Sequence, residues 1–112
     1  MSPLEINTKI AEIKGLKIML SPKDQNGLYV EAKIGGTIPY LKTTNWAENI
    51  SDAFELFEEN QEVYLKKMHY TDGTIVYQCV FRDSNLNVLG DSKADTAPMA
   101  IALAWLVWKG NK

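Results

Sequence analysis

The most reactive side chains of the chain are a single histidine, His69, and a single cysteine, Cys79. A nucleophilic Cys–His pair requires the thiol and the imidazole within hydrogen-bond reach of each other. Both residues lie in a predicted β-hairpin, and the sequence Asp72-Gly73 indicates a two-residue type I′ turn. Unless the turn has an odd length, this register puts His69 and Cys79 on opposite faces. We therefore expect Cys79 to be a small core residue and His69 a half-exposed strand residue.

Metal chemistry is poorly supported. One histidine and one cysteine are too few for the usual Cys/His zinc sites. Asp83, Asn85 and Asn87 resemble the first three ligands of a calcium-binding loop. That loop requires glycine at its sixth position and glutamate at its twelfth, where this chain has Val88 and Ala94. We expect a polar β-turn here, and neither a metal nor a cofactor.

A series of acidic side chains suggests a docking surface. The residues recur every three or four positions with no basic residue between them: Glu48, Asp52, Glu55, Glu59 and Glu62. On one helix they would form a single face, which is usually only solvated. The alternative is an acidic docking surface, with Glu55 and Glu59 as candidate partner contacts. One form of such a surface imitates the phosphates of a nucleic acid.

A second candidate site would bind a small ligand. Aromatic side chains can stack on a base, and basic side chains can hold phosphate. The candidates for these roles are Tyr29, Tyr40, Trp46, Tyr64, Lys66, Lys67 and Arg82. For each aromatic residue, a place in the core is the favoured interpretation.

The first half of the chain predicts two helices and a hairpin. Ser2, Pro3 and Glu5 have the spacing of a capping box and Gly15 is a stop signal, so we expect a helix over residues 3–14. Segments 16–20 and 28–34 flank a turn-rich stretch and indicate a hairpin, which residues 35–39 then end. The alternative for residues 16–20 is an extended connection. Residues 45–62 predict a second helix, capped by Asn49.

The predicted hairpin of residues 63–82 pairs Thr71 with Thr74 and His69 with Val76. Its expected core face carries Tyr64, Lys66, Met68, Tyr70, Ile75, Tyr77, Cys79 and Phe81. The other face carries Val63, Leu65, Lys67, His69, Val76, Gln78, Val80 and Arg82. A short further strand is expected at residues 87–89.

The stretch "APMAIALAWLVW" at residues 97–108 predicts the last helix, with Asp95 and Thr96 as candidate caps. A membrane span needs about twenty apolar residues, so this helix is too short. One stripe suits the sheet: Ile101, Ala104, Trp105 and Trp108. A second apolar set remains: Met99, Leu103, Leu106 and Val107. Either a second subunit or partner covers this set, or the first helix does, and the sequence leaves both open.

The length of 112 residues fits one domain over residues 1–112. We expect an α+β fold, with an antiparallel β-sheet packed with about three helices in a two- or three-layer sandwich. A net charge of −2 argues against a general nucleic-acid binder. A lone cysteine fits a reducing compartment, and no secretory signal is visible, so a cytoplasmic location is expected.

The last helix carries a family resemblance. The segment "DTAPMAIALAWL" resembles the phage α–β–α sandwich domain family of small phage and prophage proteins. The matching positions are Thr96, Pro98, Ala100, Ile101 and Ala104. The segments "IAEIKGLK" and "NISDAFELFEE" resemble the family's first two helices, with Leu16 replacing an aromatic residue after Gly15. Tyr40 and Thr43 or Thr44 stand for the connection before the second helix. The resemblance implies fold and phage origin, and no activity.

Three functions follow as hypotheses. The first is a non-enzymatic phage or prophage protein that acts in the host cytoplasm by binding protein. Its partner would be a second copy of the chain or a host or phage protein. It would bind neither a membrane nor nucleic acid. It would use the apolar set of the last helix or the acidic residues. The second is a ligand binder, such as a nucleotide-signal sponge in counter-defence. The third, an enzyme with His69 in a cleft, is the least supported.

Overall fold

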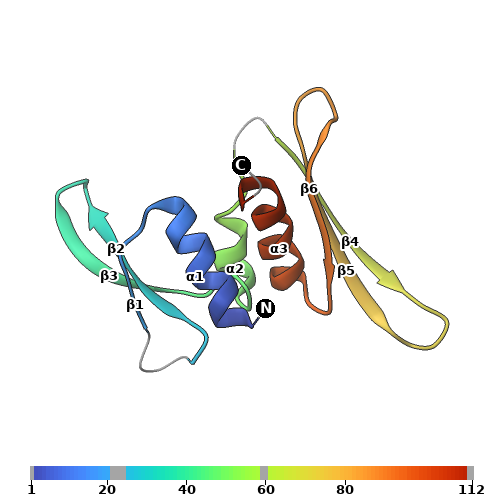
Figure 1. Cartoon of the computed structure of the whole chain (residues 1–112), viewed down its shortest axis with the longest axis horizontal. Helices are drawn as coiled ribbons and strands as arrows, with labels where there is room; N and C mark the ends of the chain where they lie inside the picture. The colour runs from blue at the N-terminus through green and yellow to red at the C-terminus, as the bar shows by residue number, and fades with distance from the viewer. Residues whose placement is uncertain (1, 21–24, 59–60, 111–112) are drawn as a thin grey trace.

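A computed structural model describes residues 2–20, 25–58 and 61–110 (Figure 1). The chain forms three helices and two three-stranded antiparallel sheets. Figure 1 shows the two sheets at opposite ends of the molecule, with the helices between them. The expected α+β class is confirmed, with antiparallel strands and three helices in layers. The strands divide between two sheets, which we call sheet A and sheet B.

Helix α1 (Pro3–Lys14) begins and ends as the sequence predicts. The hydroxyl of Ser2 accepts a hydrogen bond from the Glu5 backbone N–H at 3.2 Å, and the Glu5 carboxylate accepts from Ser2 in return. Gly15 ends the helix in the left-handed conformation, with φ of 71°. Local signals alone therefore define both ends of α1.

Sheet A has the order β1-β2-β3, formed by β1 (Ile18–Leu20), β2 (Leu28–Ile34) and β3 (Ile38–Thr44). The predicted hairpin is β1 and β2, but strand β3 was not expected. Gly35 and Gly36 do not simply end a strand, because their positive φ angles turn the chain so that it returns along β2. Pro39 is compatible with β3 because β3 is an edge strand.

The predicted helix over residues 45–62 is wrong in length, because α2 spans only Ile50–Phe54. Its cap is correct, since the side chain of Asn49 accepts a hydrogen bond from the Asp52 N–H. Before the cap, residues 45–49 form a turn, and the Ala47 N–H binds the side chain of Asn7 in α1. The next strand begins at Glu62.

Sheet B has the order β4-β5-β6, formed by β4 (Glu62–His69), β5 (Ile75–Arg82) and β6 (Val88–Ala94). The predicted two-residue turn between β4 and β5 is wrong. The loop has three residues, because the Tyr70 N–H binds the Thr74 carbonyl and Gly73 alone has positive φ. The Thr74 N–H also binds the Asp72 carboxylate at 2.9 Å. This is the pattern of a type I turn with a bulge.

The extra loop residue shifts the predicted register by one. His69 pairs with Ile75 instead of Val76, so the predicted face of β4 is reversed while that of β5 is correct. The residues that share a face with Cys79 and Phe81 are Val63, Leu65, Lys67, His69, Ile75 and Tyr77. Of the short strand expected at residues 87–89, residues 88 and 89 belong to the longer β6, and Asn87 precedes it.

Helix α3 (Ala97–Gly110) lies against β5 and β6 and also contacts α1 and α2. Within its predicted sheet-facing stripe, Ile101, Ala104 and Trp105 are buried. The ring of Trp108 lies 5.6 Å from that of Phe81, centre to centre. One hydrophobic core runs from Leu28 of sheet A through the helices to sheet B.

Helix α3 packs tightly against sheet B at Gly90 of β6. A Cβ atom at this position would overlap the backbone carbonyl oxygen of Ala104, and it would also meet Trp108. Only glycine fits at position 90 without a shift of the backbone. The atom that a side chain would overlap belongs to the backbone of α3, which cannot move aside as the end of a flexible side chain can.

We predict that Gly90→Ala lowers the free energy of unfolding by about 1–3 kcal/mol, because α3 must move away from β6. The matched control is Gly110→Ala, where the added methyl group would make only ordinary contact with Ile13. Urea denaturation of both variants tests this. Equal stability of the two variants would contradict the close packing.

Candidate functional site

The catalytic candidates His69 and Cys79 share a face of sheet B, in contrast to the expectation from a two-residue turn. They are nevertheless not partners. Cys79 pairs with Leu65, four residues along β4 from His69, a separation of about 13 Å along the strand. Cys79 is fully buried in the core as expected, and His69 is exposed near the hairpin end. None of the hollows described below has His69 in its lining.

Burial raises the pKa of the Cys79 thiol to about 12, and the nearby Asp91 carboxylate acts in the same direction. A thiol is nucleophilic only as the thiolate. At neutral pH Cys79 is therefore protonated and inert. Among the described residues, no group of three His, Cys, Asp or Glu side chains could hold a metal ion.

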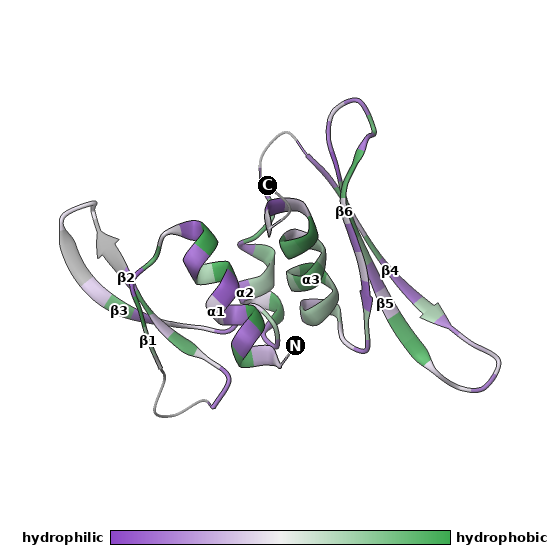
Figure 2. Cartoon of the chain, in the orientation of Figure 1, coloured by the Kyte–Doolittle hydropathy of each residue, from purple (hydrophilic) through white to green (hydrophobic). Residues whose placement is uncertain are grey.

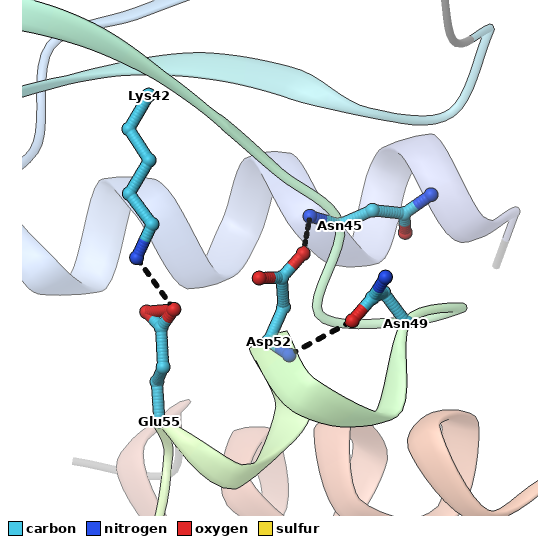
Figure 3. A network of polar contacts seen from close by, with 5 residues as sticks. All are labelled: Lys42, Asn45, Asn49, Asp52 and Glu55. Atoms are coloured by element: carbon cyan, nitrogen blue, oxygen red, sulfur yellow. Dashed lines mark hydrogen bonds and ion pairs between the residues drawn. The ribbon is translucent and has the colours of Figure 1, made fainter.

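The acidic residues do not form one helical face, so this prediction is wrong. Glu62 lies in β4, Glu48 precedes α2, and Glu59 lies outside the described residues. Figure 3 shows how two others are used. The Asp52 carboxylate accepts from the Asn45 N–H at 2.9 Å, and Glu55 pairs with Lys42 at 2.6 Å.

Basic residues from distant segments neutralise part of this acidic region. The hydrogen bond to Glu55 raises the pKa of Lys42. Lys109 at the end of α3 pairs with Glu58 at 3.0 Å. No basic residue lies between these acidic residues in the sequence, because their lysine partners belong to β3 and α3. The candidate contact Glu55 is thus engaged within the chain.

The candidate ligand residues are mostly dispersed. Trp46 is buried, Tyr29 and Tyr40 belong to sheet A, and Lys67 lies on the other face of sheet B from Lys66. Three candidates do meet: Tyr64, Lys66 and Arg82.

These three line a shallow hollow of about 300 Å³ on the face of sheet B that is turned away from α3. The centre of the Arg82 guanidinium lies 4.5 Å from the centre of the Tyr64 ring. The lining also includes Asp91, whose carboxylate accepts from the Gln78 side chain. The hollow therefore carries two cations and one anion.

The leading candidate site is a groove along α3, which we call the α3 groove. Helix α3 is its floor, and α1 and β6 form its walls. Near the end of α3 it is a hollow of about 460 Å³, lined by Lys9, Glu12, Ile13, Ser92, Leu103, Leu106, Val107 and Gly110. Near the start of α3 it is a hollow of about 520 Å³, lined by Ile6, Ala47, Glu48, Ala94, Asp95, Thr96, Met99 and Leu103. Leu103 belongs to both.

All four apolar residues that the sequence left over on the last helix line the α3 groove. Their burial is graded: Leu106 is buried, Met99 and Leu103 are half-buried, and Val107 is 41% exposed. Helix α1 thus covers part of this set and leaves the rest accessible. Figure 2 shows α3 as almost continuously hydrophobic, whereas α1 alternates between hydrophobic and hydrophilic residues.

The two ends of the α3 groove have polar rims that differ in charge. Beside the exposed Ile13, α1 contributes Lys9 and Glu12, one charge of each sign. At the start of α3, Glu48 and Asp95 contribute two negative charges. Sequence reasoning missed these rim residues, because only the packing of α1 beside α3 brings them together.

Comparisons with protein-family models, with curated protein sequences and with solved structures find no match to this chain. In the described part of the chain, no helix has both the length and the apolar character required to cross a lipid bilayer.

The Cys79 thiol generates a pH prediction. Its folded-state pKa exceeds the ordinary value of 9.0, so its contribution to stability is complete below pH 9 and declines as the pH rises toward 12. We expect the stability difference between the native chain and Cys79→Ala to shrink by about 2 kcal/mol between pH 8 and pH 10.5. Urea denaturation at both pH values measures this difference, and a constant difference would contradict the burial of a neutral thiol.

Proposed function

We propose that the chain is a small non-enzymatic accessory protein of a phage or prophage, homodimeric and cytoplasmic, that works by binding another protein. The α3 groove carries this proposal. The resemblance of residues 95–106 to the phage α–β–α sandwich domain family supports the phage origin.

The occupant of the α3 groove that fits best is an amphipathic helix of a partner protein. The floor supplies a row of apolar side chains along one helix, which matches the apolar face of a second helix. The acids Glu48 and Asp95 at one end favour a partner helix with basic residues at the corresponding end. Exposed apolar surface with a polar rim is typical of such protein contacts.

The first test uses designed peptides that form amphipathic helices with a leucine stripe, ending in either two lysines or two glutamates. We expect the lysine-ended peptide to bind about tenfold more tightly, equivalent to about 1.4 kcal/mol. Val107→Asp should weaken binding by a similar factor because it places a charge in the groove. Fluorescence polarisation measures both effects.

The matched control for Val107→Asp is Val88→Asp, at an exposed valine of β6 that is outside the groove. It should leave peptide binding unchanged. Equal affinity for the two peptides, or equal losses in the two variants, would contradict the proposed site. If Val107→Asp instead dissociates a dimer, the groove holds a second copy of this chain.

A second candidate function is the binding of a nucleotide on sheet B. The observation that favours it is the shared hollow of Tyr64, Lys66 and Arg82, since a guanidinium and an ammonium group can hold phosphate beside an aromatic ring. A nucleotide-signal sponge in counter-defence would need such a site.

Thermal-shift measurements with cyclic and linear nucleotides test this second function. A binding nucleotide at 100 times its Kd should stabilise the fold by about 2.7 kcal/mol. Arg82→Gln should remove the stabilisation, whereas Lys67→Gln, on the opposite face of the sheet, should not. No shift with any nucleotide would reject this function.

A further inference from the structure

Strand β4 is an edge strand of sheet B and hydrogen-bonds only to β5 in the described chain. It is eight residues long, and most of its side chains are exposed. Two of these are large apolar side chains, Tyr64 at 55% and Leu65 at 41% exposure. A long, exposed edge with apolar side chains is a template on which another strand can pair.

The backbone groups available on the free edge of β4 follow from the hairpin. The Tyr70 N–H binds the Thr74 carbonyl, so the backbone groups of Tyr70 point toward β5. Backbone groups alternate in direction along a strand. Those of Val63, Leu65 and Lys67 therefore point to the free edge.

We propose that a second copy of this chain pairs with β4 along this free edge. The two β4 strands run antiparallel about a two-fold axis that passes between the two Tyr64 residues. The result is one continuous six-stranded sheet shared by two subunits. The inference rests on the homodimer of the proposed function and specifies the surface and the register that form it.

The register is favoured by the side chains that it brings together. Each Glu62 lies opposite Lys66 of the second copy, which gives two opposite-charge pairs on one face of the sheet. Each Val63 lies opposite Leu65 of the second copy, and these residues exchange backbone hydrogen bonds. The two Tyr64 side chains meet at the axis. Pairs of all three kinds stabilise antiparallel strands.

Two alternative registers, which also pair side chains of the same face, are less favourable. With Lys66 at the axis, two ammonium groups oppose each other directly. With Leu65 at the axis, each Glu62 faces Met68 and each Val63 faces Lys67, so no opposite charges pair. Like charges placed directly opposite destabilise paired strands.

The side chain at the proposed axis is already ordered within one subunit. The Arg82 guanidinium lies over the Tyr64 ring, with 4.5 Å between their centres, and so covers one of its faces. Tyr64 as a whole nevertheless remains 55% exposed. Because its position is restricted before association, less conformational entropy is lost when two copies meet.

Disulfide cross-linking tests the register at single-residue resolution. At the axis, the two Tyr64 positions form a pair without direct backbone hydrogen bonds, with Cα atoms about 4.5 Å apart. This distance allows a disulfide. The two Lys66 positions would lie about 14 Å apart, which does not.

We expect Tyr64→Cys to form a disulfide-linked dimer at least about tenfold faster than Lys66→Cys under mild oxidation. The buried Cys79 is present in both variants and serves as a shared background. Circular dichroism checks that both variants are folded. Equal cross-linking rates would overturn the proposed register.

Charge exchange provides a test without new thiols. Glu62→Lys and Lys66→Glu should each raise the dissociation constant of the dimer about tenfold, as measured by sedimentation equilibrium. Each substitution places like charges opposite one another at both of the symmetry-related pairs. The double variant should restore the dimer. Lys93→Glu, on the same face but in β6, is the matched control and should have no effect. Failure of the double variant to restore the dimer would overturn the pairing.

These outcomes are separate from those that test the α3 groove. Val107→Asp should weaken peptide binding about tenfold and leave the Tyr64→Cys cross-link intact. The β4 contact would be overturned if Val107→Asp dissociates the dimer and Tyr64→Cys cross-links no faster than Lys66→Cys. A cross-linked dimer that binds no helical peptide would leave the β4 contact standing and reject the groove.

Discussion

The arrangement of the helices depends on one buried amide, the side chain of Asn7. It is fully buried in α1 and makes three hydrogen bonds. Its nitrogen donates to the Asn26 carbonyl at 2.6 Å and to the Asn45 side chain at 2.8 Å. Its oxygen accepts from the Ala47 N–H at 2.9 Å. Removal of a buried partner leaves the other groups unsatisfied, at a cost of about 1–3 kcal/mol each.

This amide joins three segments that are distant in the chain. It fixes α1 to the turn before β2 and to the turn of residues 45–49 that leads into α2. The same turn places Asn45, whose N–H binds Asp52 in the first turn of α2. Because α1 is one wall of the α3 groove and Ala47 lines its other end, the shape of the groove depends on Asn7.

The sequence was informative wherever a structure depends on adjacent residues. Ser2, Glu5, Gly15 and Asn49 each act within four residues of themselves, and the helix ends that they predict are confirmed. The errors arose from the geometry of one loop and from distant contacts. The hairpin loop closes between Tyr70 and Thr74 with three residues instead of two, which reverses the predicted face of all of β4.

The groove was predictable only in part, for a similar reason. The four apolar residues left over on the last helix follow from its periodicity alone. The position of Lys9, Glu12 and Ile13 beside them depends on tertiary packing, which no local pattern encodes. The unexpected β3 also had a tertiary effect, because it brings Lys42 to Glu55 and neutralises part of the acidic region.

The acidic residues between positions 48 and 62 therefore differ in their roles, although they are one series in the sequence. Asp52, Glu55 and Glu58 are engaged within the chain, by a backbone N–H, Lys42 and Lys109 respectively. The two ion pairs offset the charges of Glu55 and Glu58, whereas Asp52 keeps its charge and is held in place as part of the fold. Glu48 lies at the rim of the α3 groove and Glu62 on the exposed edge strand β4. At these two surfaces the negative charge can select a partner, a basic helix end at the first and Lys66 of a second copy at the other.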